Sequence, residues 1–274
     1  MDQMALSYLL LVVAAIAYLT AGIGVVRILQ VKGAVAPDWM RNVAFAGFAV
    51  HVAGVFVEMF ASDVIHFGFG MAVSAMLLIA VLITLIESCV HRVTVLTGLV
   101  LIMAAAGSVL PVIFPGEIYR SETWSMLFRV HLLVALSAYS FMSIAVIQAV
   151  LLMRMDKQLK SPMADTDKGI LANMPNLLAM ERILFRIVAC GFVCLTLVLV
   201  LGGFATMQAH GVPYVLDHKT VMTWLAWVVF AILLVGRYGF GWRKKKALTW
   251  FWAGIVVLAV AYLVYRFLIE TFLM

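Results

Sequence analysis

Long apolar stretches separated by short polar segments run through the whole sequence. An apolar run of about 18 or more residues is long enough to cross the hydrocarbon core of a membrane as a helix. On that criterion we predict eight spans, at about residues 4–29, 42–61, 68–88, 93–114, 130–153, 187–207, 221–237 and 249–270. The fold class that follows is all-α: a polytopic membrane protein built as a bundle of eight transmembrane helices.

The composition leads to the same class. The chain is 66% hydrophobic and only 12% charged, which is more apolar surface than a soluble domain can bury. No shift in composition separates a soluble region, so residues 1–274 are expected to form a single integral membrane domain. The N-terminus lacks the basic segment and the cleavage site of a signal peptide, so we expect the first span to stay in the mature protein.

The basic residues are distributed unevenly between the two sides of the predicted bundle. Of the 19 Lys and Arg residues, fifteen fall on one side. The other side has the remaining four, Arg120, Arg129, Lys219 and Arg266. Because cytoplasmic connections carry the excess of Lys and Arg, both termini are predicted outside, and the long connection from 154 to 186 inside. The excess basic residues then face the anionic inner leaflet, which accounts for the net charge of +6. No nucleic-acid partner is therefore expected.

Two polar segments outside the spans have a predicted structure of their own. Residues 117–128 mix aromatic and charged side chains, which favours a short amphipathic helix on the outer interface. Residues 157–168 mix charges with Pro162 and have no apolar period, so we expect a flexible segment there. The following stretch, 177–186, has a helical period and leads into the sixth span.

One histidine, His51, lies within a predicted span, with Glu58 two turns further along. Ionisable side chains within spans are costly and usually face the interior of a helix bundle. We interpret His51 as a buried, hydrogen-bonded structural residue. A role as a ligand or in a proton relay is the alternative.

Two other histidines stand at the outer ends of spans. His131 begins the fifth span and His218 begins the seventh, so both are expected at the same depth. Two neutral imidazoles at one level of a helix bundle suit the two axial positions of a haem iron. Asp217 and Lys219, on either side of His218, are candidates to orient an imidazole or to reach the haem propionates. His131 and His218 are therefore the candidate metal ligands, and all four residues the candidate cofactor site.

Below His131, the small or flexible residues Ala135, Ala138 and Met142 fall on one face of the helix. Such a face leaves room for a flat ligand. It is equally suited to close packing against another helix, as is usual for small residues in membranes.

The cysteines restrict the type of haem. The chain has three, and nowhere do they form a Cys-x-x-Cys or Cys-x-x-Cys-His motif. Covalent c-type attachment to this chain is thereby excluded, and a dithiol redox role is not expected. Haem b is therefore our hypothesis for the cofactor of a haem-binding protein.

The second half of the sequence resembles the cytochrome c assembly family of haem-handling membrane proteins (CcsA/CcmC-like), strongest over residues 129–270. The similar segments are the run 181–186 (Glu-Arg-Ile-Leu-Phe-Arg) and the run 217–220 (Asp-His-Lys-Thr). The second run, with Trp227, Phe230 and Arg237 after it, stands in place of the family's WWD segment. His131, with Tyr139 eight residues on, resembles the family's first external histidine. The chain is most similar to the YpjD-like branch, which implies a multi-pass protein of the bacterial inner (cytoplasmic) membrane.

The sequence also departs from this family. The tryptophan cluster that gives the WWD segment its name is missing before Asp217. The family's intramembrane histidine falls at Val235, and its second external histidine falls at about Leu273. The resemblance therefore implies haem binding without the residues of a synthase, with His218 in place of the missing partner. No enzymatic activity is expected.

Two functional hypotheses follow. The first is a haem-binding accessory protein of cytochrome c assembly or haem trafficking, holding b-type haem near the outer face. Its partners would be the lipid bilayer, haem and other membrane proteins of cytochrome c biogenesis. The second is a haem-free membrane partner or regulatory protein that keeps the fold. A small-solute transporter is a weaker third, because no pair of Gly/Pro-broken spans recurs in the two halves.

Overall fold

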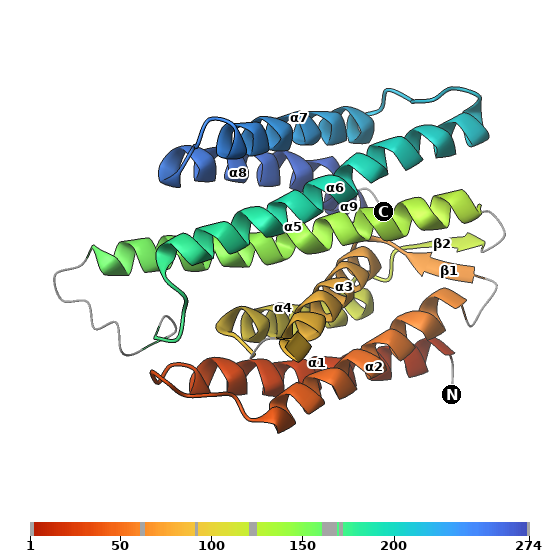
Figure 1. The fold of residues 1–274 in the computed structure, drawn as a ribbon. Coiled ribbons are helices and arrows are strands. Elements are labelled where there is room, and N and C mark those ends of the chain that lie inside the picture. Colours follow the sequence, from red (N-terminus) through yellow and green to blue (C-terminus); the bar gives the residue numbers. More distant parts are fainter. Residues whose placement is uncertain are drawn as a thin grey trace. The chain divides into compact units, whose positions relative to one another are not determined.

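The computed structural model describes residues 3–60, 64–90, 93–120, 125–160, 169 and 172–272. Within them the elements follow in this order (Figure 1): α1 (Gln3–Ile28), α2 (Asp38–Phe60), β1 (Val64–Phe67), α3 (Phe69–Val90), α4 (Val95–Ile113), β2 (Glu117–Arg120), α5 (Met126–Leu159), α6 (Leu177–His210), α7 (His218–Tyr238), α8 (Lys244–Ala259), the π-helical turn η2 (Val260–Val264) and α9 (Tyr265–Phe272). The all-α class is confirmed, with one short two-stranded ribbon added to it.

Eight helical stretches among the described residues are long and apolar enough to cross a membrane, as predicted. The eighth runs from Lys245 to Leu268 through α8, η2 and α9. The fifth and sixth are longer than the apolar pattern indicated, because α5 continues to Leu159 and α6 already begins at Leu177. The helical period of residues 177–186 is confirmed. The expected flexible segment now begins inside α5, and its residues 161–168 lie outside the described part.

The chain divides into two compact units. Unit 1 comprises Met1–Ser121 and Ser143–Leu184, and unit 2 comprises Glu122–Met142 and Phe185–Met274. Both α5 and α6 contribute residues to each unit. All the candidate site residues, His131, Asp217, His218 and Lys219, belong to unit 2.

In unit 1, α1 packs against both α2 and α4, and α3 packs against α4 and α2. Glycines allow the closest approach: a Cβ added to Gly22 would lie 2.8 Å from the carbonyl oxygen of Gly98 on α4. Such contact between backbones is typical of membrane helices, where dispersion forces depend on close packing. The interior formed in this way holds His51.

His51 is fully buried between three helices of unit 1. Its Nε2 lies 2.9 Å from Ser74 Oγ on α3, and its Nδ1 lies 3.3 Å from the Tyr18 hydroxyl on α1. The Tyr18 ring also meets the imidazole edge-on, with centroids 5.7 Å apart. Both ring nitrogens therefore have a hydrogen-bond partner, so His51 is buried and hydrogen-bonded as expected.

The amphipathic helix expected over residues 117–128 is wrong at its start. Residues Glu117–Arg120 form β2, which pairs antiparallel with β1, so that Phe67 faces Glu117. Gly116 explains the change of direction: its φ is +79°, and a Cβ there would lie 2.6 Å from the backbone nitrogen of Gly68. This close approach, which only glycine permits, lays the following residues along β1. Residues 121–124 lie outside the described part, and α5 begins at Met126.

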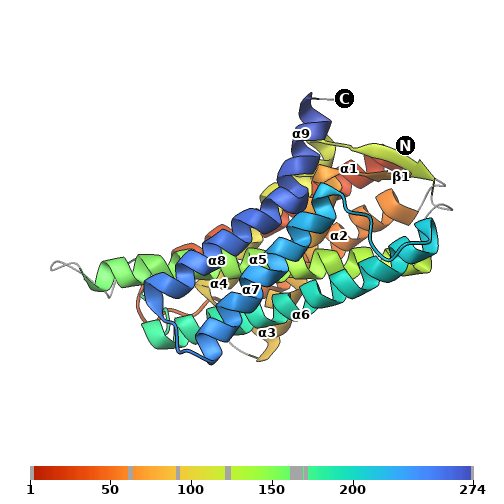
Figure 2. The same ribbon diagram turned by 90° about the horizontal axis from the view of Figure 1, so that it is seen from above.

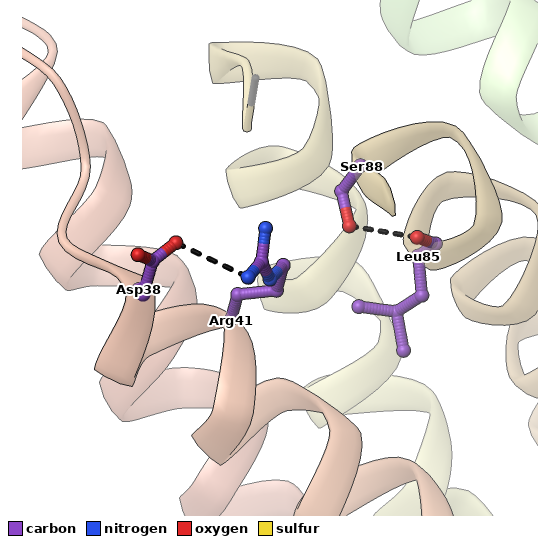
Figure 3. A network of polar contacts seen from close by, with 4 residues as sticks. All are labelled: Asp38, Arg41, Leu85 and Ser88. Carbon is purple, nitrogen blue, oxygen red and sulfur yellow. Dashed lines mark hydrogen bonds and ion pairs between the residues drawn. The ribbon is translucent and has the colours of Figure 1, made fainter. Parts of the chain in front are cut away.

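Polar contacts order the end of unit 1 at which α2 begins and α3 ends (Figure 3). Asp38 and Arg41, in the first turn of α2, form an ion pair of 3.2 Å. Ser88, in the last turn of α3, donates a 2.7 Å hydrogen bond to the carbonyl of Leu85. An exposed ion pair such as that of Asp38 and Arg41 contributes little to stability. Here the two contacts satisfy polar groups at the ends of the two spans.

At the same end, Asn173 fixes the segment before α6 to the turn after α1. Its side-chain amide donates to the carbonyls of Leu29 and Val31, at 2.8 and 2.7 Å. Its Oδ1 accepts a hydrogen bond of 2.8 Å from the Gly33 backbone. One side chain thus uses both donors and one acceptor to join two segments about 140 residues apart in sequence.

In unit 2, α7 packs against α8 and η2 (Figure 2). Hydrogen bonds of two aromatic residues, one through its backbone and one through its side chain, join these elements. Trp242, between α7 and α8, donates its backbone N–H to the Gly236 carbonyl at 2.9 Å, and its carbonyl accepts from Arg237 at 2.8 Å. On α5, the Tyr139 hydroxyl donates to the carbonyl of Leu258 at 3.0 Å. Contacts of α8 and η2 therefore reach both α7 and α5.

Candidate functional site

His131 lies in the second turn of α5, with its ring against α6. The imidazole stacks on Phe128, one turn earlier, with ring centroids 6.4 Å apart and planes inclined by 27°. Its other side faces Gly202 of α6, where an added Cβ would lie 3.2 Å from Cε1 and 3.6 Å from Nδ1. The absence of a side chain at Gly202 makes the space that this ring occupies.

One ring nitrogen of His131 is not satisfied. Its Nδ1 is buried and has no hydrogen-bond partner among the residues that the structure describes. The backbone carbonyl of Val198, one turn before Gly202, lies beside the ring. Buried polar atoms are nearly always paired, so an unpaired imidazole nitrogen calls for a specific explanation. A ligating imidazole needs one nitrogen for the metal and a polar neighbour for the other.

Gly203, the residue after Gly202, contacts the segment that leads to α7. A Cβ on Gly203 would lie 2.7 Å from the Tyr214 hydroxyl. That hydroxyl donates to the Leu199 carbonyl at 3.2 Å, and the Tyr214 ring meets Trp224 of α7 edge-on at 5.6 Å. The end of α6 that contacts His131 is thereby joined to the beginning of α7. We call this end of unit 2, where α5 and α7 begin and α6 ends, the histidine end.

His218 is the first residue of α7 and its side chain is exposed. The imidazole lies against Tyr265, the first residue of α9, with ring centroids 3.6 Å apart and planes inclined by 41°. The Lys219 ammonium group lies over the same Tyr265 ring, 5.5 Å from its centroid. The start of α7 thus presents an accessible imidazole and a cation side by side on one tyrosine.

Asp217 is the N-cap residue of α7. Its Oδ1 accepts a 2.8 Å hydrogen bond from the Thr220 backbone. Partial burial acts to raise the pKa of this carboxyl, but the hydrogen bonds from Thr220 and the charges of Lys219 and His218 outweigh it, so the pKa is lower than that of an ordinary aspartate. The carboxylate is therefore ionised at neutral pH, next to the His218 imidazole.

His131, in the second turn of α5, and His218, the first residue of α7, both belong to the histidine end of unit 2. In the described residues their rings make no contact with each other: His131 faces α6, and His218 faces α9. The structure does bring His218 and Lys219 together, on a residue that the sequence did not single out. Nor do the described residues contain any cluster of three or more His, Cys, Asp or Glu side chains with the spacing of a metal site.

Several contact residues were missed in the sequence. Tyr265 and the Gly202-Gly203 pair were not noted, and Phe128 was only one of the aromatic residues in the segment expected on the outer interface. A second group is an aromatic row between α6 and α7: Phe192 stacks on Trp227 at 5.5 Å, and Trp227 Nε1 donates to Thr196 Oγ1 at 2.9 Å. The one available signal was the pair of adjacent glycines late in a span, which is typical of close helix contact.

Several known proteins are similar to parts of this sequence. The family model described as "Cytochrome C assembly protein" matches residues 39–273. The "Inner membrane protein YpjD" of Escherichia coli (strain K12) is 34% identical over 133 residues, which cover 48% of this chain and 48% of that protein. The "Cytochrome c biogenesis protein CcsA" of Prochlorococcus marinus (strain MIT 9303) is 30% identical over 102 residues, covering 36% of this chain and 32% of the relative. That of Trieres chinensis is 33% identical over 84 residues, covering 31% and 27%.

The alignments thus span about half or less of these curated relatives, and no solved structure matches the chain. The family match is much longer, because it extends from the second residue of α2 to the end of α9 and includes both units. On that match, this multi-span membrane protein belongs to the cytochrome c assembly protein family.

Proposed function

We propose that this protein binds b-type haem at the histidine end of unit 2, with His131 and His218 as the axial ligands. It would act without enzymatic activity of its own, as an accessory of cytochrome c assembly or haem trafficking in the bacterial inner membrane. The bilayer, haem and other membrane proteins of cytochrome c biogenesis are its proposed partners. The observation that carries the proposal is the buried, unpaired Nδ1 of His131, whose ring fills the space beside Gly202.

The two histidines suit a haem iron better than a bare metal ion. A tetrahedral zinc site needs four ligands, whereas a haem iron takes only two from the protein. A pair of imidazoles at one end of a unit matches the second requirement. On His131, the buried Nδ1 has no hydrogen-bond partner among the described residues and would be the nitrogen offered to the iron.

The residues beside His218 suit the rest of the cofactor. Haem carries two propionate groups, and Lys219 supplies a cation next to the ligand. Asp217 has its Oδ1 engaged with the Thr220 backbone, so it orients the start of α7 that carries His218. When bound, haem would supply an iron that changes oxidation state by one electron. The protein residues ligate it, hold its carboxylates and exclude water on the α6 side.

Synthase activity is not part of the proposal. Val235, at the position of the intramembrane histidine of the resembled family, is a largely exposed apolar residue of α7, 59% accessible. Leu273, at the position of the second external histidine, lies outside the described residues. We also propose that residues 1–274 act as one integral membrane domain, because the family match runs through both units.

The test is spectroscopic. The protein, purified in detergent and supplied with haem, should give a Soret band and split α and β bands of a low-spin, six-coordinate haem. His131→Ala and His218→Ala should each convert it to a five-coordinate species that added imidazole restores. His51→Ala, at matched protein levels, should leave the spectrum unchanged. Wild-type spectra in both ligand variants would refute the ligand pair.

The alternative is a haem-free partner or regulatory protein. The turn between α7 and α8 is a built, cationic surface: Lys246 lies 3.9 Å from the Trp242 ring centroid, and Arg237 lies 4.9 Å from that of Phe185. Such a surface can bind an acidic protein segment. A folded protein that takes up no haem, together with loss of a membrane partner on Lys246→Glu, would favour this function.

A further inference from the structure

The last span of unit 2 is interrupted by a π-helical turn. Residues Val260–Val264 form η2, and the helix resumes as α9 at Tyr265. A π turn inserts one residue into an α-helix, so the residues after it are rotated relative to those before. Such turns cost stability and are found most often at functional sites. The rotated residues are therefore the place to look for a function.

Two tyrosines at this turn contact the two helices that carry the candidate ligands. Tyr262, within η2, lies 6.4 Å from Tyr139 of α5, measured between ring centroids. Tyr265, three residues later, lies 3.6 Å from His218 of α7. In a regular α-helix, residues three apart lie on nearly the same face. The π turn separates the two rings in angle and directs one to each helix.

We propose that Tyr265 is a positioning residue, which holds the His218 imidazole in the orientation in which it reaches a haem iron. The inference rests on the proposed haem function and adds a residue outside the histidine pair. His218 is exposed at the first position of a helix, and its imidazole lies against the Tyr265 ring. Left free, this side chain loses rotational entropy on ligation. An aromatic surface at 3.6 Å restricts the ring in advance.

Lys219 strengthens this assignment. Its ammonium group lies over the same tyrosine ring, so Tyr265 fixes the imidazole and the nearest cation relative to each other. In the contacts with both His218 and Lys219, the interacting part of Tyr265 is its aromatic ring. Phenylalanine at position 265 should therefore retain the function, whereas an aliphatic side chain should not.

The first experiment needs no haem. Diethyl pyrocarbonate modifies accessible imidazoles, and mass spectrometry gives the rate at each histidine. In Tyr265→Leu the rate at His218 should rise roughly two- to tenfold, the factor expected for the loss of one aromatic contact. Tyr265→Phe should keep the wild-type rate. Tyr238→Leu is the matched control, because Tyr238 is an exposed tyrosine at the opposite end of α7.

The second experiment uses the haem-loaded protein. The largest g value of a low-spin ferric haem depends on the angle between its two axial imidazole planes. It should shift in Tyr265→Leu and also in Tyr265→Met, whose flexible, unbranched side chain is the second choice if the leucine variant folds poorly. The largest g value should remain that of the wild type in Tyr265→Phe and in Tyr238→Leu. If Tyr265→Phe shifted the g value as much as Tyr265→Leu, the proposal would be overturned, because the effect would then depend on the hydroxyl group and not on the aromatic ring.

The two readouts separate the possible failures. Wild-type protein that binds no haem would refute the proposed function, and the modification rates would then decide by themselves whether Tyr265 holds His218. Haem bound normally, with identical g values and rates in Tyr265→Leu, would refute the positioning role and leave haem binding intact. Faster modification of His218 together with a shifted g value is the result we expect.

Discussion

The imidazole of His131 lies directly against Gly202, so that a methyl group at position 202 would come within 3.2 Å of Cε1. This distance is shorter than an ordinary contact between carbon atoms, and the ring must move to accommodate it. On the haem proposal, Gly202→Ala should displace the ligand and lower haem affinity by about tenfold, as changes beside metal ligands commonly do. Haem titration followed at the Soret band measures it.

The control for that substitution is on the same helix. Phe204, two residues later, is 63% exposed and lies on a different face of α6. Phe204→Leu should leave haem affinity unchanged. Normal affinity in Gly202→Ala would place the haem elsewhere than beside this face of α6.

His51 provides a prediction about stability alone. Replacing it with alanine leaves Tyr18 and Ser74 without their partner in the interior of unit 1. Each unsatisfied buried polar group costs about 1–3 kcal/mol, so the apparent melting temperature in detergent should fall clearly. His51→Gln, which keeps a donor and an acceptor, should recover part of the loss. A His51→Ala variant as stable as wild type would show that these hydrogen bonds contribute nothing.

The Asp217 cap should depend on pH. Its folded pKa is lowered, so its stabilising effect is fully present above the unfolded value of about 3.9 and disappears as pH falls through the folded value. At neutral pH, Asp217→Ala should destabilise the first turn of α7 by about 0.5–2 kcal/mol. Hydrogen exchange of peptides covering residues 218–222 should then be faster than in wild type. The difference should vanish well below pH 4, and Asp217→Asn should remove the pH dependence while keeping the cap.

Asn173 should protect the turn after α1. The Gly33 amide donates to Asn173 Oδ1, so Asn173→Ala should accelerate hydrogen exchange in peptides that contain Gly33. Asn176→Ala is the control, because among the described residues the Asn176 side chain accepts from the Ala179 amide, in the first turn of α6. Equal exchange in both variants would mean that the hydrogen bond to Gly33 does not form in the membrane.

The predicted orientation can be tested with fusions. A reporter active only in the cytoplasm should work after Lys246 and be silent after Met274, because fifteen of the 19 basic residues lie on the side assigned to the cytoplasm. Activity of the Met274 fusion would reverse the sides or change the number of spans. If the sides were reversed, His131 and His218 would still lie at the same depth in the membrane. If the number of spans changed, they would not.

The sequence by itself determined the class of this protein and the number of its spans. Apolar runs of sufficient length can satisfy their backbone hydrogen bonds in lipid only as helices, so their count and spacing fix the helices directly. The same reasoning identified His51 as structural, since a polar group at that depth must find partners inside the bundle. The parts of α5 and α6 that extend beyond the apolar runs, to Leu159 and from Leu177, are not indicated by hydropathy, because a helix can also continue through polar residues in water.

Only the tertiary structure decided which residues meet. The partner of His131 is Gly202 and that of His218 is Tyr265, and both pairs join positions far apart in sequence. No local period encodes such contacts, because they depend on helix rotation, and in the second pair on a single π turn. Likewise Gly116 turned an amphipathic stretch into a strand by its contact with Gly68. Hydropathy sets which segments enter the membrane, whereas close packing between backbones sets which faces touch.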